Sequence, residues 1–361
     1  MYVLLGIDTV VRIAAALLIL FVLVPALAYR RPRELDRMEW FWWCFAAGCV
    51  LLTLFGQLAT LVNIAAAPTL FVALAAFIVI VRARTRQTTP VAIIRNGVRA
   101  VVLSVLNILE GRVNLARRMR RVARHSRRFF ARTFATNSAR FAAGGWATVG
   151  VLAAIPRFYR PFATANLGFS DTYVHLYLMR LLEEGRQVDP AWGPYPRGMH
   201  FLLLAIEQLT NVDAILLMNF FGAAAGVLIV LAVADTARRL TKSLAAGLLA
   251  GAIFATMIGG AHQYFLFGGS IATMDPIEGH SFVGMPFGAI PPTNGEFDVL
   301  LTVFQRQTAT LPQELALVLL LPAIWFLLRS LRERSRWTLS GFLFSTAAIA
   351  AIHPGVVVPL V

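Results

Sequence analysis

The side chains best suited to chemistry lie in one polar stretch between apolar runs. Asp171 and His175 are four residues apart and follow directly on Phe169 and Ser170. On a helix this spacing places a carboxylate and an imidazole on one face, one turn apart, where both can contact one ion or one substrate group. The alternative is structural, since Ser170 or Asp171 is also a suitable N-cap.

A second polar group follows closely. Tyr195, Arg197 and His200 surround a Pro and a Gly at the start of an apolar segment that extends to about Thr210. Pro and Gly favour a tight entry into a helix, whose N-terminal amides attract anions. We therefore treat these three side chains as candidate substrate-binding residues. A surface turn with an interfacial tyrosine is the alternative.

A third group is acidic. Asp275, Glu278 and His280 lie within six residues, and two carboxylates with an imidazole suit a divalent cation such as Mg²⁺ or Mn²⁺. An Asp-Pro step is also a common start of a turn. Arg306 and His353 are further polar residues beside apolar segments, and we expect them to reach the same cavity.

The first two groups together carry a resemblance. Phe-Ser-Asp-x3-His followed by Tyr-Pro-x-Gly-x-His resembles the first external loop of the GT-C class of membrane glycosyltransferases, distantly like oligosaccharyltransferase catalytic subunits and bacterial arabinosyl- and mannosyltransferases. The resemblance covers roughly residues 140–260. It implies that Asp171 assists catalysis or ligates a metal, and that a second acidic motif, here Asp275, Glu278 and His280, completes the metal site.

The resemblance also implies the substrates. The donor would be a sugar on a polyprenyl phosphate, and the acceptor a glycan or lipid of the cell envelope. Such a transfer needs a base for the acceptor hydroxyl, which a carboxylate such as Asp171 supplies. It also needs a metal or an arginine to stabilise the leaving phosphate.

The composition is that of a membrane protein. Of the 361 residues, 58% are hydrophobic and 14% charged, and the mean hydropathy is +0.70, whereas globular domains are about 45–50% apolar and about 25% charged. This excludes a soluble enzyme, a disordered chain and a secreted disulfide scaffold. Cys44 and Cys49 lie five apart inside one apolar run, so we expect small core side chains rather than a disulfide or a metal site.

The net charge of +15 is concentrated in one segment, where fifteen arginines between Arg82 and Arg140 face the single acid Glu110. Between membrane spans such a segment indicates the cytoplasmic side and anionic inner-leaflet lipids rather than nucleic acid. Residues 110–140 have the spacing of a basic amphipathic helix on that leaflet. Val98–Leu109 is predicted to be a further interfacial helix, with a membrane span as the alternative.

These elements predict an all-α membrane protein with about eight transmembrane helices and a GT-C-like bundle. Every arginine cluster then falls on one side, which predicts a multi-pass protein of the bacterial plasma membrane with an external N-terminus. The chain divides into a three-span part (1–82), an arginine-rich cytoplasmic segment (83–140) and a core (141–361) with external loops 157–211 and 261–313. The apolar runs are approximately Ile7–Tyr29, Trp40–Leu61, Pro68–Val81, Gly144–Pro156, Asp213–Ala234, Leu244–Ile258, Leu315–Leu328 and Leu339–Val361.

Local signals predict one helix over residues 171–184 in the first external loop, ended by Gly185. Its apolar stripe would consist of Tyr173, Val174, Tyr177, Leu178, Leu181 and Leu182. Two other functions stay open, namely a lipid or polysaccharide transporter or flippase component, and a scaffold subunit that binds partners through the arginine-rich helix. The apolar sequence at Val361 is typical of a fragment of a longer chain.

Overall fold

The computed structural model describes residues 2–25, 31–62, 75, 78–79, 89–109, 124, 137–163, 170–186, 196–257 and 312–354. Within these ranges every regular element is a helix and there is no strand. The prediction of an all-α protein is therefore confirmed for the described part of the chain.

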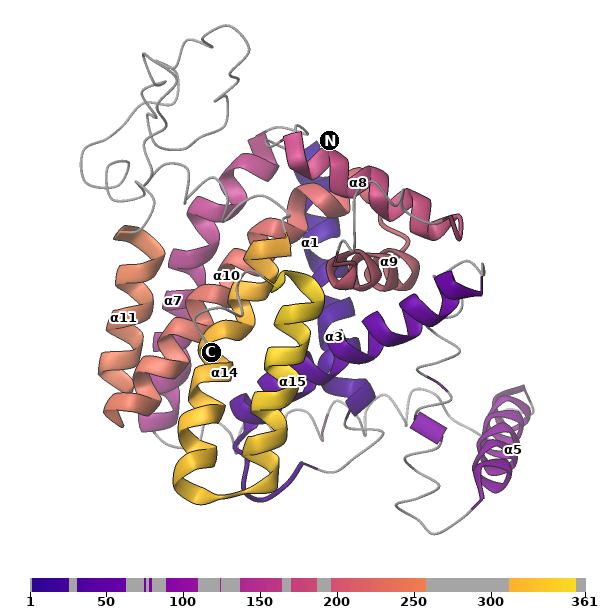
Figure 1. Ribbon diagram of the computed structural model, residues 1–361, viewed down its shortest axis with the longest axis horizontal. Coiled ribbons are helices and arrows are strands. Elements are labelled where there is room, and N and C mark those ends of the chain that lie inside the picture. Colours follow the sequence, from indigo (N-terminus) through magenta and orange to yellow (C-terminus); the bar gives the residue numbers. More distant parts are fainter. Residues whose placement is uncertain are drawn as a thin grey trace, which may run out of the picture.

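The helices form a bundle of long, roughly parallel rods with two helices lying across one end (Figure 1). In chain order they are α1 (Tyr2–Leu18) with its π-helical continuation η1 (Ile19–Leu23), α3 (Arg37–Leu61), α5 (Pro90–Leu109), α7 (Asn137–Ala163), α8 (Ser170–Glu183), α9 (Gly198–Thr210), α10 (Ala214–Thr241), α11 (Leu244–Met257), α14 (Pro312–Glu333) and α15 (Arg336–Ile352).

Five segments of the described chain are long and apolar enough to cross a membrane. They are α1 with η1, α3, the Arg140–Tyr159 part of α7, α10 and α14, while α11 and α15 are shorter apolar helices. At 28 residues α10 is about 42 Å long, more than the roughly 30 Å of the hydrocarbon core. By length and composition these helices support the predicted membrane class. The count of eight spans stays a prediction, and the third predicted apolar run, Pro68–Val81, lies almost entirely outside the described residues.

Helix α10 is the centre of the bundle, because α1, α7, α11 and α14 all pack against it. The two transverse helices differ in burial. Every residue of α9 from Gly198 to Glu207 is buried, so this helix is a layer of the core and not a surface loop. Cys44 and Cys49 are free thiols buried in the same core, as expected from their apolar run.

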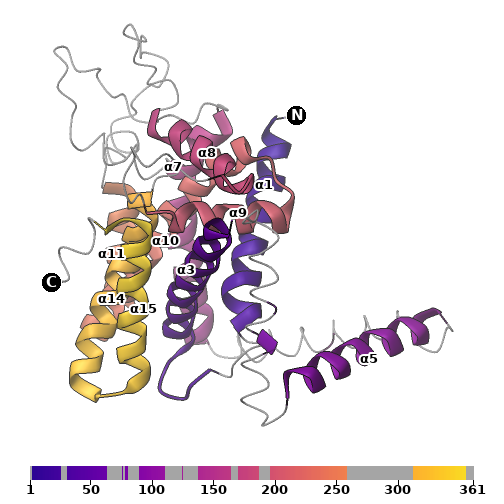
Figure 2. The ribbon, with the colours of Figure 1, turned by 45° about the vertical axis from the view of Figure 1, so that its right-hand side comes forward.

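Three of the arginine clusters lie at the same end of the bundle. Figure 2 places the start of α3, the turn between α14 and α15, and α5 at this end, with α8 and the N-terminus at the other. Ion pairs from Arg238 and Arg239 to Asp36, and from Arg329 to Glu39, join the clusters directly. We call this end, which carries residues 31–39, 238–242 and 329–336, the arginine-rich end, and the opposite end, which carries α8 and α9, the histidine end.

A buried polar network closes the arginine-rich end. Glu39 is 2% exposed and its carboxylate accepts from Arg239 at 2.9 Å, from the indole of Trp325 at 2.8 Å and from Arg329. Asp235, also 2% exposed, accepts from Nε of Arg239 at 2.8 Å. Each buried charge therefore has an oppositely charged partner, which is the condition for burying charge at a tolerable cost.

The start of α3 contributes to this network through its cap. Asp36 accepts from the amides of Met38 and Glu39, while Glu39 accepts from the amide of Asp36, so the two form a capping box. Burial alone raises the pKa of Asp36, but hydrogen bonds from Arg239 and from the Glu39 amide, with the charges of Arg239 and Arg238, lower it below its ordinary value. The helix start and the ion network are thus one structure.

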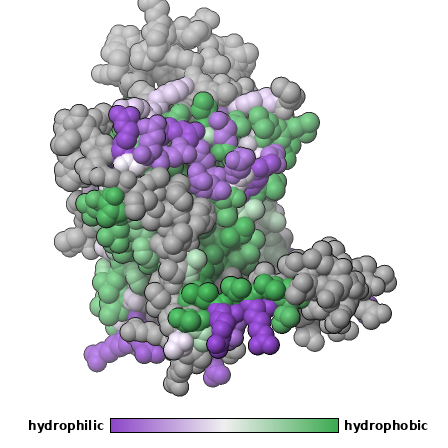
Figure 3. Space-filling model, turned by 90° about the vertical axis from the view of Figure 1, so that its right-hand side faces the viewer, coloured by the Kyte–Doolittle hydropathy of each residue, from purple (hydrophilic) through white to green (hydrophobic). Residues whose placement is uncertain are grey.

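Helix α5 is set apart from the bundle, at the level of the arginine-rich end (Figure 2). Val91, Ile94, Val98 and Val102 are exposed apolar residues at three- to four-residue spacing, and Figure 3 shows this apolar face above a hydrophilic face. The helix begins at Pro90, eight residues before the predicted start at Val98. Its two-faced surface is typical of a helix that lies in a membrane interface.

Helix α7 differs from its prediction at its C-terminal end. We predicted a span ending at Pro156 and a polar loop from Arg157, but the helix continues to Ala163. Arg157 is 0% exposed, and its guanidinium donates to the carbonyls of Ala153 at 3.2 Å and Ala255 at 3.4 Å. Pro156 has no amide hydrogen and so cannot donate to the carbonyl of Leu152, four residues earlier. The guanidinium of Arg157 joins α7 to α11 through the carbonyl of Ala255.

Candidate functional site: a buried histidine pair

The structure brings together two histidines that are 25 residues apart in the chain. Nδ1 of His175 in α8 lies 3.2 Å from Nε2 of His200 in α9, and the ring centroids are 5.3 Å apart. One nitrogen donates the hydrogen bond and the other accepts it. Both rings are buried, His200 completely and His175 to 5% exposure, so this is a desolvated imidazole pair at the histidine end.

Helix α8 positions His175 through its buried face and its C-terminal stop. Leu178 and Leu182 are buried on the face that also carries His175. Gly185 has φ 73°, and the amides of Gly185 and Arg186 bond back to the carbonyls of Leu182 and Leu181. This is a Schellman motif, which needs a residue with left-handed φ. The helix predicted over 171–184 and its glycine stop are confirmed.

The predicted apolar stripe of α8 is only half correct. Its leucines face the core, but Tyr173 and Tyr177 are 50% and 58% exposed. The leucines occupy the buried positions because, unlike the tyrosines, they have no polar atom that would need a hydrogen-bond partner there. A charged contact fixes the other side of the helix, where Arg180 donates to Glu183 and, at 3.1 Å, to Glu207 of α9.

Helix α9 positions His200 through an unusually close contact at its first residue. A Cβ on Gly198 would lie 2.8 Å from the carbonyl oxygen of Ala351 and 2.9 Å from Oγ1 of Thr53. Only glycine therefore lets the start of α9 sit against the end of α15 and the middle of α3. The helix predicted to begin here and to run to Thr210 is confirmed.

The electrostatics of the pair are asymmetric. The pKa of His200 is lowered to about 3, mainly by burial and also by the charges of His175 and Arg197, while a hydrogen bond with the backbone of Arg197 opposes the shift. His200 is thus neutral near pH 7. Burial also lowers the pKa of the half-buried Arg197, which nevertheless leaves it a cation beside the pair.

His353 lies near the same place in the fold. It is the C-cap of α15, and its amide donates to the carbonyl of Ile349 at 2.7 Å. Nδ1 of His353 is buried and has no hydrogen-bond partner among the described residues. Ala351, two residues earlier, is the residue that Gly198 touches, so the structure places His353 in the segment that borders the start of α9.

Asp171 occupies the first turn of α8, as predicted. Its backbone is four residues before that of His175, and helical geometry therefore places the two side chains on one face. The side chain of Asp171 is outside the described part of the structure. Its pairing with His175 stays a prediction.

Five other predicted site residues lie outside the described residues, namely Tyr195, Asp275, Glu278, His280 and Arg306. Within the described ranges no group of three or more His, Cys, Asp or Glu side chains is arranged to hold a metal ion. Three of the four predicted metal ligands fall outside those ranges, so we assign no chemical step to a metal.

Sequence reasoning missed two buried polar residues, Arg157 near the end of α7 and Glu314 at the start of α14. Arg157 was assigned to a loop, but it is buried in the bundle, and Glu314 in the first turn of α14, 4% exposed, attracts it electrostatically. The available signal was the spacing of Val149, Ala153 and Arg157, which repeats every four residues and continues the buried face of the helix. A buried arginine at the end of a candidate span is itself a marker of function.

The fold and site define an all-helical membrane protein with a buried histidine pair at one end. The chain matches no protein-family model, no curated protein and no solved structure.

Proposed function

We propose that the protein is a multi-pass membrane glycosyltransferase of the GT-C type that works at the histidine end. The observation that carries this proposal is the desolvated His175–His200 contact, 3.2 Å long, on two helices that lie across that end. The predicted Asp171 is one helical turn away, and the cationic Arg197 is the residue before the start of α9. A base and a phosphate-binding cation are what sugar transfer from a lipid phosphate needs.

In the proposed reaction the acceptor hydroxyl oxygen attacks the anomeric carbon of the sugar. The bond from that carbon to the phosphate oxygen breaks, and the polyprenyl phosphate leaves with the electron pair. Asp171 takes the hydroxyl proton, and His175 holds or relays it, because the neutral His200 keeps its ring in place. Arg197 neutralises the departing phosphate.

The proposal includes an orientation. Positively charged loops stay on the cytoplasmic side of bacterial membranes, so the arginine-rich end would be cytoplasmic and the histidine end external, in the plasma membrane. The eight-span count and a GT-C-like arrangement of the spans belong to the same proposal. The donor is then a polyprenyl-phospho-sugar and the acceptor a cell-envelope glycan or lipid.

The location of the polar groups favours transfer over transport. Transporters place substrate-binding groups near the middle of broken spans, whereas the histidine pair lies on transverse helices at one end of the bundle. The scaffold function would use residues 110–140, which lie almost entirely outside the described residues. We therefore take the transferase as the function that the site supports best.

The test is transfer from a radiolabelled polyprenyl-phospho-sugar in membranes that contain the full chain. Asp171→Asn and His175→Gln should each lower transfer by about 10²-fold or more, the usual contribution of a general base. Glu184→Gln is the control, because its carboxylate lies at the exposed end of α8 and, among the residues that the structure describes, pairs only with Arg186. Full activity in both site variants at equal expression would remove the assignment.

His200 serves as a positioning residue and needs a different measurement. His200→Gln should lower kcat and also move the pH profile of transfer, because the orientation and proton affinity of His175 change together. A structural role alone would lower activity without moving the profile. Reconstituted vesicles that move the lipid-linked sugar across the bilayer without altering it would identify a transporter and overturn the proposal.

A further inference from the structure

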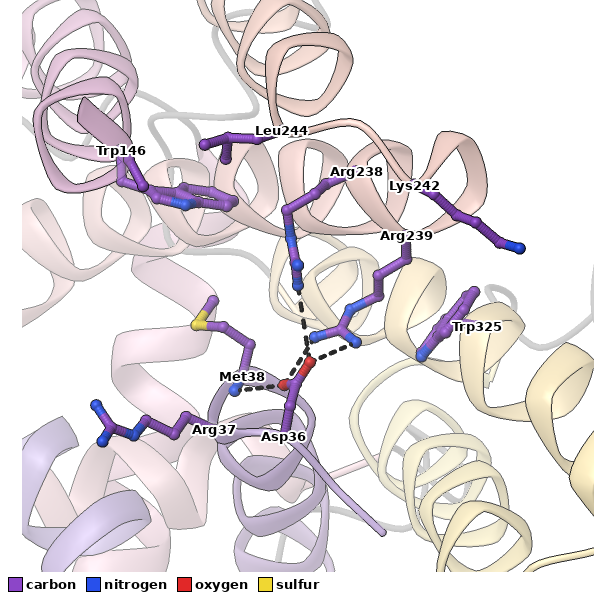
Figure 4. A pocket seen from close by; sticks show the side chains of 10 residues that line it. Asp36, Arg37, Met38, Trp146, Arg238, Arg239, Lys242, Leu244 and Trp325 are labelled. Carbon is purple, nitrogen blue, oxygen red and sulfur yellow. Dashed lines mark hydrogen bonds and ion pairs between the residues drawn. The ribbon is translucent and has the colours of Figure 1, made fainter. Parts of the chain in front are cut away.

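A groove of about 870 Å³ lies at the arginine-rich end, far from the histidine pair. It is bounded by the starts of α3, α7 and α11 and by the end of α10 (Figure 4). Its volume falls within the usual range of small-molecule sites, about 300–1,000 Å³. The proposed glycosyltransferase reaction makes no use of this groove.

The groove is rich in cations. Arg37, Arg238, Arg239 and Lys242 line it, and Asp36 is the one acid among the ten lining residues. Asp36 is already engaged, since it accepts from Arg239 and from the amides that it caps. An anion entering the groove therefore meets a positive surface whose carboxylate is already neutralised.

Two of these cations, Arg238 and Lys242, have N–H donors that bond to no acceptor among the described residues. Nε and Nη2 of Arg238 bond to Asp235 at 3.2 and 2.7 Å, but Nη1 donates to no described residue, and the side chain is 30% exposed. The ammonium of the exposed Lys242 likewise makes no bond to any residue that the structure describes. Arginine and lysine donors of this kind are the usual partners of phosphate oxygens.

The remaining lining is apolar. Trp146 presents its ring to the groove, and Met38 and Leu244 lie on either side (Figure 4). Trp146 lies six residues after the start of the candidate span Arg140–Tyr159, which is the interfacial level where tryptophan is enriched. A free phosphate ion has no apolar part to pack against this surface, whereas the glycerol and first methylenes of a lipid can pack there.

From these observations we propose that the groove binds the headgroup of an anionic phospholipid from the leaflet at the arginine-rich end. The phosphate accepts from Nη1 of Arg238, with Lys242 at the rim adding charge, and the glycerol region packs against Trp146 and Leu244. Helix α11 begins at Leu244, so its N-terminal amides favour the same anion. This site is separate from the proposed glycosyltransferase site.

The first experiment is native mass spectrometry of the full chain, purified in detergent and titrated with phosphatidylglycerol or phosphatidylcholine of the same acyl chains. Phosphatidylglycerol should be retained in preference. Arg238→Gln and Lys242→Gln should each weaken its binding about five-fold, the usual effect of one basic residue beside an anionic lipid surface. Trp146→Leu should weaken both lipids.

The matched control is Arg332→Gln, which removes one positive charge from an exposed position at the same end but outside the groove. Its binding should equal that of the unmodified chain. Arg238→Gln also removes contacts to Asp235, so if that variant fails to fold, Lys242→Gln and Trp146→Leu decide the question. Unchanged lipid retention in those two variants would overturn the site.

The second experiment uses the fact that Lys242 is the only lysine of the chain. A bound headgroup covers its ammonium, so phosphatidylglycerol should slow the modification of Lys242 by an amine-reactive reagent several-fold more than phosphatidylcholine does. A lysine introduced by Arg332→Lys reports the general effect of the lipid surface and should be slowed less. Equal slowing at both lysines, or equal protection by inorganic phosphate alone, would contradict a lipid headgroup site.

Discussion

Nη1 of Arg239 lies 2.9 Å from Oε1 of Glu39, and the two side chains are 7% and 2% exposed. The same carboxylate also accepts from Trp325 and from Arg329. One buried acid therefore connects α3, α10 and α14. The stability of the arginine-rich end depends on its charge.

Glu39→Ala should destabilise the protein strongly. The substitution leaves Arg239 and Arg329 without a shared partner, and breaking a buried ion pair on one side typically costs about 3–5 kcal/mol. Thermal unfolding in detergent should show a lower melting temperature. Glu333→Gln is the comparison, because Glu333 pairs with Arg329 from a side chain that is 47% exposed, and its loss should cost no more than about 1 kcal/mol. Similar melting of the two variants would contradict the network.

Gly198→Ala should also destabilise. The new methyl group would meet the carbonyl oxygen of Ala351 at 2.8 Å, and a backbone atom cannot move aside as a side-chain tip can, so we expect a loss of about 1–3 kcal/mol. Gly150→Ala in α7 is the matched change, since nothing lies within 4 Å of its Cβ position. There, helix propensity favours alanine by up to about 1 kcal/mol. We expect the melting temperature to fall in Gly198→Ala and to rise in Gly150→Ala.

Stability should fall with decreasing pH because of His200. Its pKa is about 3 in the folded protein, against 6.5 ordinarily, so between these values the unfolded chain binds the proton and the folded chain does not. The stabilisation that comes from burying neutral His200 is therefore fully present above pH 6.5 and is lost as the pH falls toward 3. Melting temperatures between pH 4 and 8 measure this slope. The slope should be smaller in His200→Leu, and an unchanged slope would contradict the assignment.

Helix α5 should lie in the membrane surface with its valine face inward. In a chain whose two buried cysteines are replaced by alanine, an environment-sensitive fluorophore at Val98→Cys should show a blue-shifted emission in vesicles. The same label at Asn96→Cys, on the polar side of the helix, should report water. Similar apolar environments at both positions would instead indicate a transmembrane span, the alternative left open by the sequence.

The sequence was sufficient where local signals dominate. The spacing of Ser170 and Gly185 predicted α8, and the arginine clusters predicted that the ends of α3, α10 and α14 lie together, as their ion pairs confirm. Both inferences rest on chemistry that acts within a few residues or on a general rule about loop charge. Neither inference required knowledge of how the helices pack against one another.

The sequence was insufficient where packing decides. Spacing paired His175 with Asp171, and only the crossing of α8 and α9 showed that His200 is its neighbour. Arg157 was placed in a loop after a span ending at Pro156, but its side chain donates to two carbonyls inside the bundle. Glu39 gave no sign that it would be buried, because its partners are in helices encoded about two hundred residues or more later.

The position of Glu39 early in the chain has a consequence for biosynthesis. Chains are made from the N-terminus and their elements assemble in that order, so α3 enters the membrane before either arginine partner of Glu39 has been translated. Until Arg239 and then Arg329 have been translated, this carboxylate lacks the two cations with which it is paired in the folded protein. The pairing of Glu39 with Arg329 can therefore form only after α14 has been synthesised.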